Sequence, residues 1–102
     1  MLRLPPFPLA RFAVADTSMQ PALRPGDRVV VVRWFSPRAR DIVVVRDPAY
    51  PKRFLVKRLS ERAPGGFVVL SDNPNVGTDS RVFGPVRREQ LVGKVVWRYG
   101  TR

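Results

Sequence analysis

The sequence places a serine and a lysine in settings that could support nucleophilic chemistry. Ser18 follows a short apolar run and precedes Met19-Gln20-Pro21, where a turn shaped by proline can hold a hydroxyl exposed and fixed. Lys57 lies in the run Phe54–Leu59, and strand alternation puts its side chain on one face with Leu55 and Leu59. Burial there disfavours the ammonium form and lowers the lysine pKa, which suits a general base. The alternatives are an ordinary turn serine and an edge-strand lysine that discourages aggregation.

Two residue types are absent, and their absence limits the catalytic mechanisms and metal sites that the chain can have. The 102 residues include no cysteine and no histidine. Thiolate catalysis, disulfides, cysteine-based metal sites and a Ser-His-Asp triad are therefore excluded, and the usual nitrogen ligands for transition metals are missing. Proton transfer near neutral pH must use a carboxylate, a tyrosine or a lysine with a shifted pKa. We expect no metal ion and no cofactor.

A third segment, residues 71–86, concentrates short hydrogen-bonding side chains. It reads Ser-Asp-Asn-Pro-Asn-Val-Gly-Thr-Asp-Ser-Arg-Val-Phe-Gly-Pro-Val. Such side chains satisfy backbone groups in tight loops, so the segment predicts a structured loop. Within it, Asp79 could pair with Arg81 or face a buried lysine.

The charge balance leaves a binding function open. Nineteen basic residues against eight acidic ones give a net charge of +11. This excess suits an anionic partner such as nucleic acid, a membrane surface or an acidic protein, although scattered arginines also serve solubility. In a small basic β-barrel that binds nucleic acid, aromatic side chains would stack on bases between arginines. The candidates for stacking are Trp34, Phe35, Phe54, Phe67 and Tyr99.

The elements that must position these residues are short strands. Eleven prolines interrupt the chain, and no uninterrupted window shows helical periodicity. We predict an all-β barrel or sandwich, with residues 1–10 as a proline-rich arm and residues 11–102 as one domain. The longest aliphatic run is only Val29–Val32, so no bilayer span is expected, while peripheral contact of the arm with a membrane surface stays open. The predicted strands are Arg11–Ala15, Arg28–Trp34, Asp41–Arg46, Arg53–Leu59, Gly66–Ser71 and Gly93–Tyr99.

In their order and spacing, the three segments resemble the type I signal peptidases and their relatives. The likeness covers Ser18–Asp27, the Val56-Lys57-Arg58 strand and the box that ends in Asp79-Ser80-Arg81. It implies an all-β catalytic core of coiled, mostly antiparallel sheets, like that of the signal peptidases and the SOS repressor proteases. It also implies that Ser18 is the nucleophile, Lys57 the general base, and the Ser18 N–H an oxyanion donor. Asp79, Ser80 and Arg81 would brace the site, and Met19 and Pro21 would lie on the substrate side.

The chain departs from the family pattern at several positions near the expected site. Asp16 stands where relatives have serine or glycine, so its carboxylate must point away from the oxyanion or the oxyanion hole must differ. The serine that hydrogen-bonds the lysine in relatives falls at Gly77, and Thr78 is the neighbouring hydroxyl that could replace it. Ser71 stands where the late box usually opens with glycine, and Arg40-Asp41 replaces a second Gly-Asp.

The segments that we expect the chain to lack indicate which subgroup of this family it resembles. We expect neither the N-terminal spanning helix and extra β domain of ordinary signal peptidases, nor the upstream cleavage segment of self-cleaving repressors. The chain is similar to the nickel-type superoxide dismutase maturation proteases in Asp72-Asn73-Pro74 and in Phe83–Val86. The expected function is therefore a soluble, cytoplasmic serine endopeptidase that removes an N-terminal extension from a precursor protein. The nucleic-acid-binding barrel and a catalytically inactive homologue are the alternatives, and no nucleic acid is expected as a partner of the protease.

Overall fold

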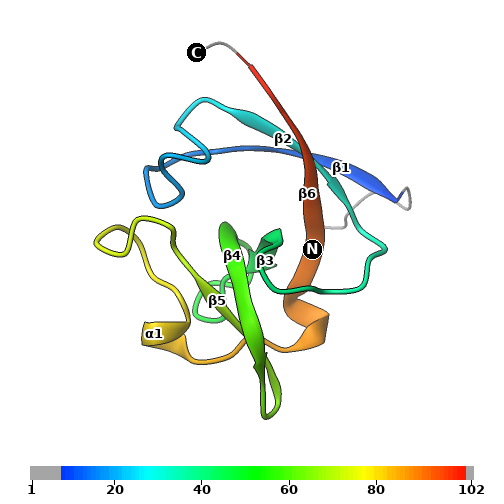
Figure 1. The fold of residues 1–102 in the computed structure, drawn as a ribbon, viewed down its shortest axis with the longest axis vertical. Coiled ribbons are helices and arrows are strands. Elements are labelled where there is room, and N and C mark those ends of the chain that lie inside the picture. The colour runs from blue at the N-terminus through cyan, green and yellow to red at the C-terminus, as the bar shows by residue number, and fades with distance from the viewer. Residues whose placement is uncertain (1–7, 101–102) are drawn as a thin grey trace.

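The computed structural model describes residues 8–100, which form one sheet of six strands (Figure 1). Every neighbouring pair in the sheet is antiparallel, and the strand order is β1-β2-β6-β3-β4-β5. Two short helical turns complete the described chain. The elements are β1 (Leu9–Ala13), β2 (Arg28–Val32), β3 (Ile42–Arg46), β4 (Phe54–Ala63), β5 (Gly66–Leu70), α1 (Ser80–Phe83), η1 (Arg88–Gln90) and β6 (Leu91–Tyr99).

The last strand holds the two ends of the sheet together. β6 pairs with β2 along one edge and with β3 along the other, and Figure 1 shows it crossing from the β1–β2 end toward the β3–β4–β5 end. The register shifts between Val30 and Val31 and between Val44 and Val45, both opposite β6. Such bulges bend strands and increase their twist, so the sheet coils around its own core instead of lying flat.

Two apolar clusters form on opposite faces of β3, the valine-rich strand whose central residues are buried on both sides. Val44 contributes to the first cluster, and Val43 and Val45 contribute to the second. Phe54 and Val56 of β4 pack against the first cluster, while Leu55 and Leu59 belong to the second. Strand alternation explains the division, because successive side chains of one strand face opposite sides.

The structure confirms the predicted all-β class with mostly antiparallel pairing, and each of the six predicted strands is present. β4 extends to Ala63, beyond the predicted end at Leu59, because a two-residue turn at Pro64-Gly65 joins it directly to β5. Gly65 has a φ of 83°, a conformation that favours glycine. β1 begins at Leu9, so the expected boundary at residue 10 falls inside this strand. The rest of the predicted arm, residues 1–7, lies outside the described residues.

None of the helices described within residues 8–100 is long and apolar enough to cross a membrane.

Candidate active site

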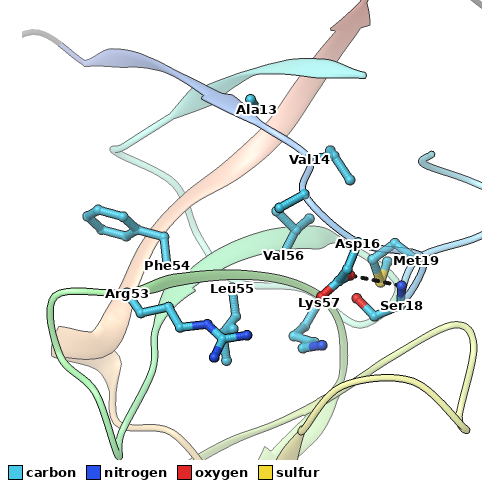
Figure 2. Close-up of a pocket in the computed structure, with 11 residues that line it drawn as sticks. Ala13, Val14, Asp16, Ser18, Met19, Arg53, Phe54, Leu55, Val56 and Lys57 are labelled. Carbon is cyan, nitrogen blue, oxygen red and sulfur yellow. Dashed lines mark hydrogen bonds between the residues drawn. The ribbon is translucent and has the colours of Figure 1, made fainter. Parts of the chain in front are cut away.

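A pocket opens between the chain that leaves β1 and the first half of β4. Residues 13–16, 18, 19 and 53–57 line it. Figure 2 shows Ser18 and Lys57 at one end of this pocket, with Arg53, the residue that precedes β4, further from Ser18. Two segments that lie far apart in the sequence therefore supply one concave site.

Ser18 is held by the late loop as well as by its own turn. The Asn73 N–H donates a hydrogen bond of 2.8 Å to the Ser18 carbonyl oxygen, and the Asn73 side-chain amide donates to the Thr17 carbonyl oxygen at 3.3 Å. Met19 continues the turn, since its carbonyl oxygen accepts from the Leu23 N–H at 2.9 Å. The Ser18 residue is only 3 % exposed. The backbone around Ser18 is therefore held on both sides.

Lys57 is buried in β4 between Leu55 and Leu59, as the strand alternation predicts. Its Nζ donates a hydrogen bond of 2.9 Å to the Ser71 hydroxyl oxygen, which is also buried. Burial is the largest cause of a lowered Lys57 pKa, and the Arg53 charge lowers the pKa further. The carboxylates of Asp16, Asp79 and Asp47 act in the opposite direction without reversing the shift.

The backbone of Gly77 lies against both candidate catalytic side chains. A Cβ atom built on Gly77 would fall 3.4 Å from Lys57 Nζ and 3.5 Å from Ser18 Cβ. The two side chains therefore lie side by side, and the late loop passes directly over them. The position that carries the lysine-bonding serine in the family pattern does reach Lys57, but here it has no side chain. Its φ of 73° also favours glycine.

Asp16 faces Ser18 instead of pointing away from it. The Ser18 N–H donates a hydrogen bond of 2.9 Å to Asp16 Oδ1 (Figure 2). Burial raises the Asp16 pKa, but hydrogen bonds from the Ser18 N–H and hydroxyl, with the charges of Lys57 and Arg53, lower it overall. The carboxylate is thus ionised at neutral pH. The carboxylate therefore does not point away from Ser18, and an oxyanion hole that differs from the family pattern stays a prediction.

The late box forms a chain of contacts that ends at Lys57. Asp79 accepts hydrogen bonds from the Ser71 N–H at 2.8 Å and from the Arg81 guanidinium at 2.6 and 3.1 Å. Burial raises the Asp79 pKa, but these contacts outweigh that effect and lower the pKa from 3.8 to about 2. The Ser80 hydroxyl oxygen accepts from the Val69 N–H at 2.8 Å, which attaches the loop to β5. Arg81 therefore holds Asp79, Asp79 holds the backbone of Ser71, and the Ser71 hydroxyl contacts Lys57.

The remaining predicted residues divide between the pocket and the surface. Met19 lines the pocket and is also buried in the first apolar cluster, with 1 % of its surface exposed. Pro21 is exposed and lies outside the residues that line the pocket, while Thr78 is exposed beside the late loop. The hydroxyl group that contacts Lys57 belongs to Ser71.

Three residues near the site were not singled out from the sequence. Ser71, Asn73 and Arg53 contact the candidate pair or line its pocket. Ser71 and Asn73 stand inside the late box, so the box itself was a signal, but its spacing does not show which side chain faces inward. Arg53 stands four residues before Lys57, a spacing that places both on the same face of a strand.

The proposed stacking aromatics do not gather into an exposed surface. Phe67 is buried, and Phe35, Phe54 and Tyr99 are half-buried. Trp34, at 72 % exposure, is the one largely exposed member of the five. Within residues 8–100, no cluster of three or more histidine, cysteine or acidic side chains is placed to hold a metal ion.

The geometry suits removal of a proton from a hydroxyl group. A buried amine with a lowered pKa is neutral over a wider pH range than an exposed one, and a neutral amine has a lone pair that can accept a proton. Ser18 carries the hydroxyl group that lines the same pocket as that amine. The pocket next to the pair offers room for a reacting group.

Comparison with known proteins relates the chain to peptidases. A 35-residue stretch is 49 % identical to signal peptidase IB of Staphylococcus aureus, in strains that include N315, MW2 and COL. The matched stretch makes up 34 % of this chain and only 18 % of those relatives. The family described as Peptidase S24-like matches residues 4–96. Because that match covers most of the sequence, the chain belongs to the peptidase S24-like family.

Proposed function

We propose that the protein is a serine endopeptidase in which Ser18 is the nucleophile and Lys57 is the general base. The observation that carries this proposal is the buried Lys57 amine beside Ser18 in one pocket, in a chain without histidine. Membership of a peptidase family supports the reaction class. A serine–lysine pair is one of the few ways to activate a hydroxyl group when histidine is absent.

In the first step, Lys57 takes the hydroxyl proton as Ser18 Oγ bonds to the carbonyl carbon of the substrate. The π electrons of that carbonyl move to its oxygen, and the Ser18 N–H stabilises the resulting negative charge. As the C–N bond breaks, the Lys57 ammonium gives its proton to the leaving amine. Lys57 then takes a proton from a water molecule as its oxygen bonds to the acyl carbon, and the Lys57 ammonium returns this proton to Ser18 Oγ as the acyl–oxygen bond breaks.

The pocket edge of β4 supports an extended peptide as the substrate. β3 covers one edge of β4, but β5 pairs with β4 only from Arg58 to Ala63. Along Phe54–Lys57, the other edge therefore has no paired strand among the described residues. An extended chain can add to such an edge through main-chain hydrogen bonds. Small side chains at Ala13 and Ala15 form part of the facing wall.

For the substrate, we propose a cytoplasmic precursor protein that loses an N-terminal extension, with nickel superoxide dismutase as the first candidate. The resemblance in Asp72-Asn73-Pro74 and Phe83–Val86 supports this choice. The direct test is incubation with the precursor, followed by mass spectrometry of the new N-terminus. If peptides with other sequences are cleaved while the precursor stays intact, the assigned substrate is wrong and the reaction class stands.

The catalytic pair is tested by three substitutions. Ser18→Ala, Lys57→Met and Lys57→Arg should each reduce kcat/KM by at least about 10³-fold, because the pair acts as a unit. Arginine fails because its guanidinium keeps its proton in this pH range. Activity of the native chain should rise with pH through the lowered pKa of Lys57, since only the neutral amine accepts a proton.

Lys52→Arg is the matched control, because Lys52 is an exposed residue outside the pocket lining. It should retain full activity. If Lys57→Arg keeps most of the native rate, the serine–lysine mechanism is wrong.

A further inference from the structure

We propose that Asp16 controls the rate of this site: its carboxylate holds Ser18 in the resting enzyme and must leave before the oxyanion can form. This inference rests on the proposed function, because it concerns the step that Ser18 and Lys57 carry out. It assigns Asp16 a role opposite to that of an oxyanion donor.

The contact itself is short and local. Asp16 Oδ1 accepts a hydrogen bond from the Ser18 N–H at 2.9 Å. Aspartate side chains commonly accept from the N–H two residues further along, which stabilises the turn. Oδ2 remains at the pocket side, 4.0 Å from the position of a Cβ built on Gly77. The carboxylate thus occupies the Ser18 N–H, the donor that the oxyanion needs.

The reaction cannot proceed with this contact in place. When Ser18 Oγ bonds to the carbonyl carbon, the carbonyl oxygen gains a negative charge and needs the Ser18 N–H as a donor. That N–H already serves a negative carboxylate. Two like charges at one donor repel each other, so the Asp16 side chain must rotate away first.

Asp16 also acts against the general base. The charged groups that influence Lys57 are Asp16, Asp79 and Asp47, which favour the ammonium, and Arg53, which disfavours it; the neutral Ser71 hydroxyl accepts from Nζ. Of the three carboxylates, Asp16 has the largest effect. Removing its charge should therefore make the neutral amine more abundant near neutral pH.

Arg53 is the group placed to receive the displaced carboxylate. It lines the same pocket, directly precedes β4, and has a charge that already acts on Asp16 (Figure 2). Its backbone is held by bonds to Tyr50 and Asp47, so the exposed side chain extends from a supported position. An Asp16–Arg53 pair would leave the Ser18 N–H free.

The experiment compares cleavage of one synthetic peptide library by the native chain and by three variants. Asp16→Gly removes the acceptor, Asp16→Ser also adds a hydroxyl that can donate to the oxyanion, and Asp16→Asn keeps an acceptor without the charge. We expect kcat/KM to rise about 10-fold or more in the glycine and serine variants, a part of the roughly 10² to 10³ that one oxyanion donor contributes. The rise should be smaller in the asparagine variant. The pH–rate profiles of all three should move to lower pH.

A double-mutant comparison tests the role of Arg53. Arg53→Ala should slow the native chain, which needs a site for the displaced carboxylate, more than the Asp16→Gly chain, in which only the effect of the Arg53 charge on the Lys57 pKa is lost. Glu89→Ser is the control for charge, because Glu89 is an exposed carboxylate in η1 and lies outside the pocket. It should leave the rate and the pH profile unchanged.

Nuclear magnetic resonance gives a readout that needs no substrate. The Ser18 amide signal of the native chain should follow the titration of Asp16 in the acid range, and the Asp16→Gly chain should lack this response. Absence of the response in the native chain would overturn the inference, as would an Asp16→Gly variant that folds but cleaves no faster. If neither chain cleaves any peptide, the proposed function fails and this inference fails with it. If the native chain cleaves and Asp16→Gly is no faster, only this inference fails.

Discussion

At the scale of single residues, the hydroxyl group that contacts Lys57 comes from a different position in the late loop than the family pattern predicts. Gly77 lacks the side chain that would reach Lys57, and Ser71 supplies a hydroxyl group from the end of β5. A neutral amine has two N–H groups and one lone pair. When Ser71 accepts one N–H, the rotation of the amine is restricted and the lone pair can be directed toward Ser18. Ser71 is therefore a positioning residue.

Ser71→Ala should lower kcat by roughly 10²-fold, the cost of misplacing a reacting group by about 1 Å. It should also lower the Lys57 pKa further, because a buried ammonium loses its acceptor. The alkaline rise in activity would then begin at lower pH, while Ser71→Thr should keep both the rate and the profile. Lysine side-chain resonance titration can follow this pKa directly, since the chain has only three lysines. An unchanged pH profile in a folded Ser71→Ala chain would contradict the positioning role.

At the scale of elements, the site depends on strands that pack closely around β6. β6 lies between β2 and β3, and Gly93 faces β2 at close range. A Cβ at this position would fall 2.9 Å from the Val32 carbonyl oxygen and 3.0 Å from Val31 Cγ2. The close approach needs a residue without a side chain. Through β3, β6 supports β4, the strand that carries Lys57.

Gly93→Val should destabilise the fold by about 1–3 kcal/mol, the usual cost of forcing extra atoms into a packed interior. Urea unfolding measures the change. Val96→Ala is the matched control on the same strand, because Val96 is 53 % exposed and its substitution should change the unfolding free energy by less than about 0.5 kcal/mol. Equal stability of the two variants would show that β2 and β6 separate without cost at Gly93.

At the scale of the whole molecule, acid stability is linked to the site through Asp79. This carboxylate is 4 % exposed and joins Arg81 to Ser71. Its pKa is about 2 in the folded protein, whereas the ordinary value without these contacts is 3.8. A lowered pKa stabilises the folded state above pH 3.8, and this contribution is lost as the pH falls through about 2.

Asp79→Asn should therefore lower the free energy of unfolding by about 2 kcal/mol near pH 6, and the difference should shrink toward pH 2. The asparagine amide carries no charge and keeps one acceptor oxygen in place of two, so it loses the ion pair with Arg81 and the hydrogen bonds that the second oxygen accepts from Arg81. Urea unfolding at several pH values checks both statements. Glu89→Gln removes an equal charge from an exposed side chain and should have little effect. A pH-independent difference between Asp79→Asn and the native chain would contradict the linkage.

The sequence by itself determined the strand content, because valine-rich runs separated by proline and glycine leave few alternatives to short strands. It also predicted the burial of Lys57, because alternate residues of one strand share a face and Lys57 stands between Leu55 and Leu59. The exclusion of a histidine-based mechanism needed only the composition. These conclusions depend on residues that are neighbours in the chain.

Only the tertiary structure decided which side chains surround the pair. Ser71 is fourteen residues from Lys57 in the chain, and its approach depends on how the late loop docks over β4 and β5. The position of β6 between β2 and β3 is likewise a pairing of distant segments. The direction of Asp16 was open because a carboxylate two residues before a serine can turn either to that N–H or to solvent. Spacing along the chain describes one element at a time, whereas these contacts form where separate elements meet.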